Sequence, residues 1–362
     1  MLVKLKKLFK IIIVNLGAFV LLIIFIEFLG HSVYFLKNGH FIFVKSELVE
    51  VNESIFEQHP YLIGQLKNNI SISNKGLKVS TTNYHTRVTG AKGEKNNKIV
   101  IALLGGSTTF GTKVSDNESW PYLLQEMLGD KFYIINFGMP GYSTVEAIIQ
   151  LAIQIPEFCP DIIINYHGWN DIHNYHLPEF DSNYRQHGMM QFTNLSIKSC
   201  EGMNNYSSIL FLIKKIKQII NQTFGESQKK QSLDYDTPDI LVDRIYARNI
   251  RRINDLSQSI AKTIYFVPQI LNESAYYTST ENDYWSPTIR DTAMPSLMKH
   301  FNILMKNQID TSESIFIEEV LKVNWERDDF KDRGHFSLKG GIKFANIIKT
   351  IILSDSNLGS SN

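Results

Sequence analysis

The chain has 362 residues, of which 43% are hydrophobic and 20% are charged, and 37 lysines and arginines nearly balance 36 aspartates and glutamates. This composition is typical of a globular protein with a large core, and it excludes disordered, collagen-like and strongly basic nucleic-acid-binding classes. Two cysteines, Cys159 and Cys200, are too few for a disulfide framework or a four-cysteine zinc site. The chemistry must therefore be read from motifs.

The first element is an apolar run from Ile11 to Leu29, which only Asn15 and Glu27 interrupt with strongly polar side chains. At about 1.5 Å per residue, a helix of this length nearly crosses a hydrocarbon core of about 30 Å. Positive charges precede the run, at Lys4, Lys6, Lys7 and Lys10. They predict a cytoplasmic N-terminus, a transmembrane signal-anchor over residues 1–35, and an exported remainder that is periplasmic or at the cell surface.

Other interpretations of this segment are a cleavable signal peptide and a buried core helix. Gly30-His31-Ser32 offers small residues for cleavage, but a signal peptide has a shorter apolar region of about 7–15 residues. The basic flank disfavours a core helix. In an exported chain Cys159 and Cys200 could form a disulfide, or both could be small hydrophobic thiols.

Residues 36–97 are polar and irregular, and we interpret them as a stalk and a peripheral lead-in. A regular alternation begins at Lys98. Apolar runs predict strands over 98–104, 132–137, 161–166, 263–267 and 314–317. Helical patterns lie over 119–128 and 145–155, and a third helix starts with Thr237 as its cap and Pro238 in its first position. Buried strands that alternate with helices predict a parallel sheet with helices on both faces.

The alternation stops between Tyr175 and Tyr235, and we interpret residues 176–236 as an insertion in a domain over 98–354, with 355–362 as a tail. The insertion contains an amphipathic helix over 209–220 and a polar stretch over 221–231. A lid, a membrane contact and an ordinary surface helix are all compatible with this segment.

Ligands bind at the carboxyl ends of the strands in an open parallel sheet, so polar residues just after the strands are candidate site residues. Ser107 lies in a glycine-rich turn after the first strand, where its hydroxyl can be exposed. Asp332 precedes His335 by three residues, so its carboxylate can accept the imidazole Nδ1–H and leave Nε2 to face a serine. The N–H of Gly141 and the amide of Asn170 can stabilise an oxyanion. Together these residues predict acyl-transfer chemistry.

Each of these motifs also has a purely structural interpretation. Ser107 can be a turn residue, Gly141 can permit a turn after Pro140, and Asn170-Asp171 can cap the following segment. The functional interpretation rests on four such features in order, three of which directly follow predicted strands.

These blocks resemble the SGNH (GDSL-like) hydrolase superfamily, most closely its membrane-anchored bacterial branch. The similarity covers about residues 98–175 and 323–351, and is looser at His59-Pro60-Tyr61 and 263–268. The chain departs from the name-giving motif at Gly106, where that motif has Asp, although the anchored branch carries Gly-Gly-Ser-Thr there. The resemblance implies a three-layer α/β/α domain with a flavodoxin-like sheet, and hydrolysis or transfer of an acyl ester, with no cofactor and no metal. It implies these roles: Ser107 as nucleophile, His335 as general base, Asp332 as orienting carboxylate, and Ser107, Gly141 and Asn170 as the oxyanion hole.

The leading hypothesis is a serine esterase that acts on O-acyl groups, such as acetyl, of an extracytoplasmic carbohydrate or lipid, with the membrane and this substrate as its partners. If a sugar hydroxyl replaces water, the same triad would serve an O-acyltransferase. A non-catalytic anchored member of an envelope-assembly complex is the third hypothesis, because a fold alone does not establish catalysis.

Nucleotide and metal sites are the remaining alternatives. Residues 106–111 have the glycine spacing of a P-loop, but Thr112 separates the second glycine from Lys113, and no Walker-B aspartate ends the strand over 162–166. The α/β-hydrolase elbow needs glycine where Thr109 stands. A metal could bind the histidines of one segment, although no further ligand of fixed spacing is evident. These histidines are His167, His173 and His176, with His187 nearby.

Overall fold

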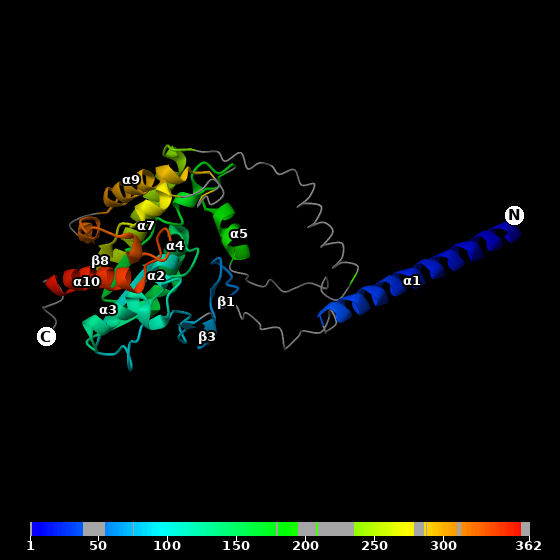
Figure 1. Cartoon of the computed structure of the whole chain (residues 1–362), viewed down its shortest axis with the longest axis horizontal. Helices are drawn as coiled ribbons and strands as arrows, with labels where there is room; N and C mark the ends of the chain where they lie inside the picture. The colour runs from blue at the N-terminus through cyan, green and yellow to red at the C-terminus, as the bar shows by residue number, and fades with distance from the viewer. Residues whose placement is uncertain are drawn as a thin grey trace. The chain divides into compact units, whose positions relative to one another are not determined.

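Figure 1 presents the chain as a computed structural model, which describes residues 2–38, 55–74, 76–178, 180–194, 208, 235–278, 286, 288–309 and 313–355. The chain divides into two units, and each is described by itself. One comprises Met1–Glu53 with Lys198–Lys230, and the other Ser54–Ile197 with Gln231–Asn362. The helix expected over 209–220, the polar stretch over 221–231, and Cys200 lie outside the described residues, whereas Cys159 is described and exposed.

The first unit contains a single long helix, α1, over Leu2–Asn38. Its segment Phe9–Leu36 spans 28 residues with a mean hydropathy of 2.8, and none of it is buried in the structure. The segment is therefore long and apolar enough to cross a membrane. The predicted apolar N-terminal helix is confirmed, and by length and composition it could be a membrane anchor or a signal sequence.

The second unit is built on five parallel strands. They are β5 (Ile99–Gly105), β6 (Phe132–Asn136), β7 (Ile162–Tyr166), β8 (Thr263–Phe266) and β9 (Ser314–Phe316). Their order is β6-β5-β7-β8-β9, and Leu103 of β5 pairs with Asn136 on one side and Ile164 on the other. Numbered along the chain this order is 2-1-3-4-5, which is the flavodoxin-like arrangement. The predicted strands and their parallel sheet are confirmed.

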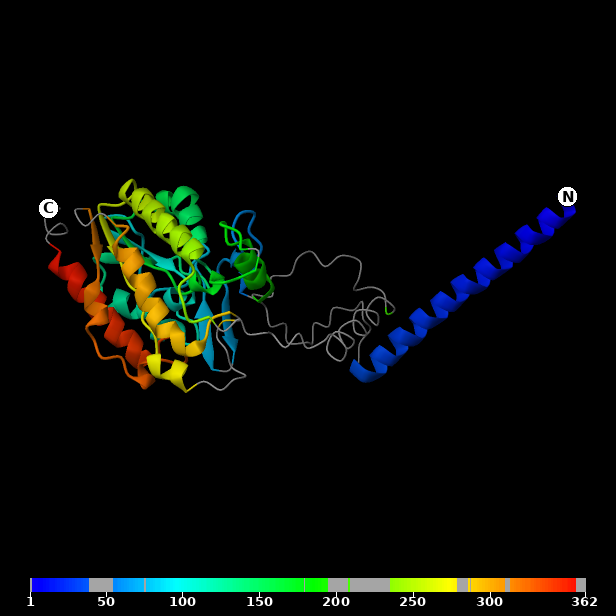
Figure 2. The same ribbon diagram turned by 90° about the horizontal axis from the view of Figure 1, so that it is seen from above.

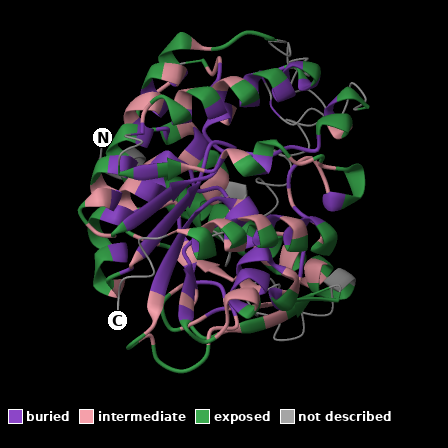
Figure 3. Ribbon diagram, turned by 90° about the vertical axis from the view of Figure 1, so that its left-hand side faces the viewer, coloured by how far each residue is buried: buried purple, intermediate pink, exposed green. Residues whose placement is uncertain are grey.

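Helices cover both faces of the sheet (Figure 2). On one face lie α4 (Thr144–Ile153), α7 (Ile240–Gln258) and α9 (Met294–Lys306), and on the other α3 (Trp120–Leu128) and α10 (Leu338–Ser354). Because side chains alternate along a strand, Ala102 and Leu104 of β5 pack in the first layer and Ile101 and Leu103 in the second. Figure 3 shows the buried residues gathered in the strands and on the inward sides of the helices. The predicted α/β/α layers are confirmed.

Shorter elements connect these layers, and one predicted boundary is wrong. The described short helices are α2 (Ser107–Phe110), α5 (Arg185–Asn194) and α8 (Glu273–Tyr277), and the 3-10 turns are η1 (Asp116–Glu118), η2 (Ile155–Phe158), η3 (Ile172–Asn174), η5 (Asp291–Ala293), η6 (Glu318–Leu321) and η7 (Arg327–Asp329). Thr237 does not cap α7. Asp239 does, because its Oδ1 accepts the N–H of Leu241 at 2.9 Å and of Val242 at 3.3 Å.

The residues before β5 belong to the second unit, which begins at Ser54 and not at the expected domain boundary, Lys98. They form two antiparallel hairpins, β1 (Phe56–Glu57) with β2 (Gln65–Leu66) and β3 (Ser71–Asn74) with β4 (Leu77–Ser80). Arg87 follows them and is 1% exposed. Its guanidinium reaches the carbonyls of Phe110, Gly111 and Val114 at 2.9, 2.5 and 2.7 Å. This lead-in therefore fixes the loop that follows α2.

Candidate active site

Ser107 is the first residue of α2 and directly follows two glycines that allow a close approach between loops. A Cβ at Gly105 would lie 2.7 Å from the carbonyl oxygen of Tyr166, and one at Gly106 would lie 2.6 Å from Nδ2 of Asn170. The turn from β5 into α2 thus places Ser107 against the loop that follows β7. Its side chain is neither fully buried nor fully exposed, so a substrate can reach it.

The structure brings together the three residues that the sequence predicts as a triad. Nε2 of His335 lies 2.8 Å from Oγ of Ser107, although the two residues are 228 positions apart. Nδ1 of the same imidazole lies 2.8 Å from Oδ2 of Asp332. Since a carboxylate only accepts, Nδ1–H donates to Asp332, and Nε2 is left to accept the hydroxyl proton of Ser107.

The loop that carries Asp332 and His335 is held by its own hydrogen bonds and by a glycine contact. Oδ1 of Asp332 accepts the N–H groups of Gly334 and His335, both at 2.9 Å. A Cβ at Gly334 would lie 2.3 Å from the ring of Trp169, so only glycine allows this loop to pack against the loop after β7. The pair is therefore fixed as one rigid turn.

Asn272 and Asp291 anchor the same loop from outside. The N–H of Asn272 donates to the carbonyl of Arg333 at 2.9 Å, and Nδ2 of Asn272 donates to the carbonyl of Asp332 at 3.1 Å. The Arg333 guanidinium pairs with the buried Asp291 carboxylate at 2.7 Å. These contacts come from the segments after β8 and before α9, and they hold His335 at Ser107.

Lys113 adds a positive charge to the triad carboxylate. Its Nζ lies 2.7 Å from Oδ2 of Asp332. Burial alone would raise the pKa of Asp332, but the hydrogen bond and charge of His335, the N–H of Gly334 and the Lys113 ammonium together hold that pKa well below its usual value. Lys113 has a left-handed backbone (φ 71°), and Arg87 fixes the carbonyls on both sides of it.

The predicted oxyanion-hole residues lie on adjoining loops. Nδ2 of Asn170 donates to the carbonyl of Tyr142 at 2.8 Å. The same nitrogen is the atom nearest to a Cβ placed at Gly106. Gly141 has φ 86°, a conformation that glycine adopts without strain. Within the described part of the chain, the N–H groups of Ser107 and Gly141 donate to no backbone carbonyl. Both remain available as donors, as an oxyanion hole requires.

Comparisons with known proteins give no family match by sequence. No family model matches the chain, and no curated protein matches it. Solved structures do resemble it. An α/β hydrolase from the metagenome of Lake Arreo, Spain, is 11% identical and has a TM-score of 0.41, with 71% of this chain and 96% of that chain covered.

Two further solved structures resemble the chain to the same degree. A catalytic mutant of an acetylxylan esterase from Geobacillus stearothermophilus is 14% identical with a TM-score of 0.39, covering 73% and 96% of the two chains. TesA is 10% identical with a TM-score of 0.41, covering 70% and 97%. Matches at this level leave the activity to be argued from the residues themselves.

The alternative metal site is not assembled. Within the described ranges, no group of three or more histidines, cysteines and carboxylates is arranged to hold a metal ion. His176 stacks on Tyr235 with ring centroids 4.0 Å apart, whereas His187 donates from Nε2 to the carbonyl of Gly141 at 2.9 Å. Burial lowers the pKa of His167 to about 3 and that of His173 well below its usual value, so both imidazoles are neutral.

Asp171 is buried and does not cap the segment that follows it. Its Oδ1 accepts the backbone N–H of Thr144 at 3.1 Å and also the hydroxyl of the same residue. It thereby joins the loop after β7 to the start of α4, where Ser143 and Glu146 form a capping box. Burial raises the pKa of Asp171 to about 7.

Several residues that support the candidate triad lie in segments where the sequence predicts no functional residue. Arg87 lies in the lead-in that was expected to be peripheral, and Lys113 was considered only as a displaced phosphate-binding lysine. Asn272 lies just after β8, where the rule that ligands gather at the carboxyl ends of strands could have singled it out. Arg87 gave no such signal, because three of its hydrogen bonds go to backbone carbonyls.

Proposed function

We propose that the chain is a serine esterase of the SGNH type, whose catalytic residues are Ser107, His335 and Asp332. The observation that carries this proposal is the continuous path from Oγ of Ser107 through the imidazole to Asp332, with both steps at 2.8 Å. A serine, an imidazole and a carboxylate in this order form the set that activates a hydroxyl nucleophile.

In the acylation half of the reaction, Oγ of Ser107 attacks the ester carbonyl while Nε2 of His335 takes the hydroxyl proton. The N–H groups of Ser107 and Gly141 and the amide of Asn170 stabilise the oxyanion. The intermediate then collapses, the bond to the leaving alcohol breaks, and that alcohol takes the proton from His335. Asp332 stays ionised and stabilises the imidazolium during both steps.

In deacylation a water molecule attacks the acyl-enzyme, and His335 takes its proton. Collapse of the second tetrahedral intermediate releases the carboxylic acid and returns the proton to Oγ of Ser107. A sugar hydroxyl in place of this water would give an acyltransferase with the same residues. We propose hydrolysis of O-acyl esters, such as acetyl esters, of an extracytoplasmic carbohydrate or lipid.

The decisive experiment uses the full chain in detergent with 4-nitrophenyl acetate as substrate. Ser107→Ala should lower kcat by about 10³-fold or more, since the nucleophile is removed. Ser259→Ala, which changes an exposed serine at the end of α7, is the matched control and should leave kcat unchanged. A fluorophosphonate should label Ser107 in the wild type only. Labelling of neither protein, with no turnover, would instead support the non-catalytic anchored role.

We further propose that α1 anchors the protein with its N-terminus in the cytoplasm and the second unit outside. The support is the four lysines that precede the apolar segment. Alkaline phosphatase fused to the C-terminus should be active. A fluorescent protein that matures only in the cytoplasm should give no fluorescence when it is fused there. The reverse pattern would contradict the proposed orientation.

A further inference from the structure

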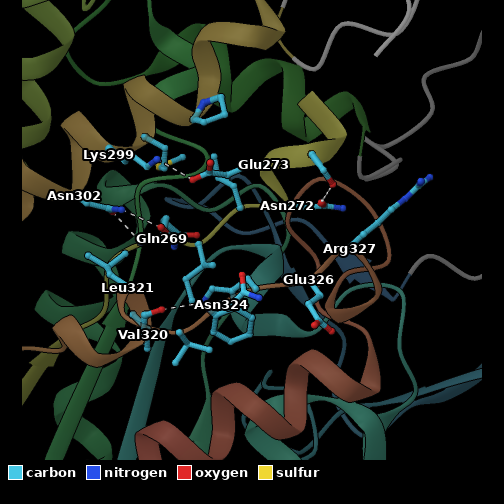
Figure 4. A pocket seen from close by; sticks show the side chains of 17 residues that line it. Gln269, Asn272, Glu273, Lys299, Asn302, Val320, Leu321, Asn324, Glu326 and Arg327 are labelled. Carbon is cyan, nitrogen blue, oxygen red and sulfur yellow. Dashed lines mark hydrogen bonds and ion pairs between the residues drawn. The ribbon is translucent and has the colours of Figure 1, made fainter. Parts of the chain in front are cut away.

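The segments that hold the candidate site lie on two sides of it. Ser107 follows β5, and β6 and β8 lie on opposite sides of that strand in the sheet. On the β8 side, Asn272 anchors the triad loop, and Figure 4 shows it in the wall of a cavity of about 830 Å³. The residues that line this cavity include none of the triad or of the proposed oxyanion hole. On the β6 side, the loop after the strand carries Gly141.

Gly141 is the member of the proposed oxyanion hole with the greatest conformational freedom. Its φ is 86°, and because glycine has no side chain it reaches many other conformations at little cost. A backbone N–H stabilises an oxyanion strongly only if it already points to the place where the negative charge develops. The proposed reaction therefore requires contacts that restrict this residue.

His187 of α5 supplies such a contact. Its Nε2 lies 2.9 Å from the carbonyl oxygen of Gly141, and because a carbonyl only accepts, Nε2 carries the proton. The side chain is 1% exposed, and its Nδ1 has no hydrogen-bond partner in the described part of the chain. Burial lowers the pKa of His187, so the imidazole is neutral at neutral pH. The hydrogen bond fixes the direction of the Gly141 carbonyl.

Gln191 contacts the same glycine from one helical turn further along α5. A Cβ at Gly141 would lie 3.0 Å from each of Cβ, Cγ and Oε1 of Gln191. Residues four apart share one face of a helix, so the same face of α5 touches both the carbonyl and the Cα of Gly141. The N–H of Gly141 is left free of any backbone carbonyl among the described residues.

The lead-in places α5 against this loop. A Cβ at Gly188 would lie 3.2 Å from Cγ2 of Ile63, so the helix and the lead-in pack closely. Ile63 packs against a small apolar cluster that includes Tyr142, the residue after Gly141. The hydroxyl of Tyr142 also donates to the carbonyl of Gly64 at 2.6 Å. The lead-in and α5 therefore hold the loop after β6 together.

We propose that His187 is a positioning residue of the esterase reaction, which keeps the N–H of Gly141 aligned as an oxyanion donor by hydrogen-bonding the carbonyl of the same glycine. The proposal rests on the esterase function proposed above. In this role His187 touches no substrate and moves no proton. Without its hydrogen bond the glycine loses its alignment, and the transition state is stabilised less.

The test measures kcat and KM of the full chain in detergent with 4-nitrophenyl acetate. His187→Leu and His187→Phe remove the donor with different side-chain volumes, and each should lower kcat by about 10- to 100-fold with KM within about threefold of wild type. His187→Gln keeps an N–H donor and should restore kcat to within about fivefold of wild type. Labelling of Ser107 to completion by a fluorophosphonate counts the active enzyme, so each kcat refers to folded protein.

Gln191→Ala tests the same contact without removing a fully buried side chain, so it applies even if the donor-free variants do not fold. It removes Cγ and Oε1 from beside Gly141 and should lower kcat by about three- to tenfold. Met190→Ala is the matched control at an exposed position of α5 and should leave kcat unchanged.

The proposal is overturned if the donor-free variants keep the wild-type kcat, or if His187→Gln is as slow as they are. If neither donor-free variant folds, a wild-type kcat for Gln191→Ala overturns it. Failure of the esterase proposal looks different, since the wild type would then neither hydrolyse 4-nitrophenyl acetate nor react with the fluorophosphonate.

Discussion

Lys113 and His335 share one carboxylate oxygen. Oδ2 of Asp332 lies 2.7 Å from the ammonium of Lys113 and 2.8 Å from Nδ1 of the imidazole. The ammonium therefore competes for the negative charge that would stabilise a protonated His335. Both groups help to hold the pKa of the Asp332 carboxyl well below its usual value.

Lys113→Met should raise kcat/KM for 4-nitrophenyl acetate modestly, by about two- to threefold. Without the cation, Asp332 stabilises the imidazolium that forms in the transition state more strongly. The measurement is the hydrolysis of 4-nitrophenyl acetate at a single pH. Lys113→Arg keeps a cation at this position and should retain the wild-type kcat/KM. A Met variant with an unchanged or lower kcat/KM would show that Lys113 does not weaken the action of Asp332 on the imidazole.

A methyl group at position 106 should act through Asn170. Because the added Cβ would lie 2.6 Å from Nδ2 of Asn170 and 3.2 Å from the carbonyl of Tyr142, Gly106→Ala should displace the amide. We expect kcat to fall by about 100- to 1,000-fold, as for the loss of one oxyanion donor. Asn170→Ala should cost a similar factor. In a double-mutant cycle the two losses of kcat should not add. Full additivity would show that Gly106→Ala does not act through Asn170.

Loss of the Arg87 guanidinium should destabilise the second unit more than the loss of an exposed arginine. Arg87 is buried, and its Nε also pairs with Asp116 at 3.1 Å. Arg87→Ala removes the cation that pairs with the Asp116 carboxylate and the donors that reach the three loop carbonyls, which should cost about 3–5 kcal/mol. Thermal unfolding followed by circular dichroism should show a Tm lower by roughly 10 °C. Arg251→Ala, at an exposed position of α7, should change Tm little.

Asp171 should make the folded state less stable as the pH rises. Burial raises its pKa to about 7, so between the unfolded value near 4 and about 7 the folded state holds a proton that the unfolded state has lost. This contribution is complete below the unfolded pKa and is lost as pH rises through the folded one. Asp171→Asn, whose Oδ1 can still accept from Thr144, should therefore match wild type at pH 4 and gain stability relative to it by pH 8. We expect a gain of order 1–4 kcal/mol, and urea unfolding at both pH values measures it.

Local patterns predicted the sheet, and order along the chain predicted the site residues. The strand β5 and the turn after it could be predicted, because a strand buried on both faces is apolar throughout and a tight turn favours glycine. Ser107, Asp332 and His335 could be chosen because a hydroxyl nucleophile needs these partners. Their meeting could not be derived from spacing, since 228 residues separate Ser107 from His335.

The remaining features depend on contacts that leave no local signal. The Thr237 cap was wrong because Asp239 also caps well, and only the path of the chain decides between two capping residues. α9 and α10 were not predicted, although Phe344 and Ile348 of α10 lie on one buried face. Most hydrogen bonds of Arg87 and those of Asn272 to the loop that carries Asp332 go to backbone carbonyls, which every residue has.

The contacts of Arg87 also limit how far the chain can be shortened from its N-terminal side. Removing everything before Lys98 would keep all the strands, yet it would delete the guanidinium that ties the segment after α2 in place on either side of Lys113. The shortest fragment suited to secretion or crystallisation must begin upstream of Phe56, so that both hairpins are retained.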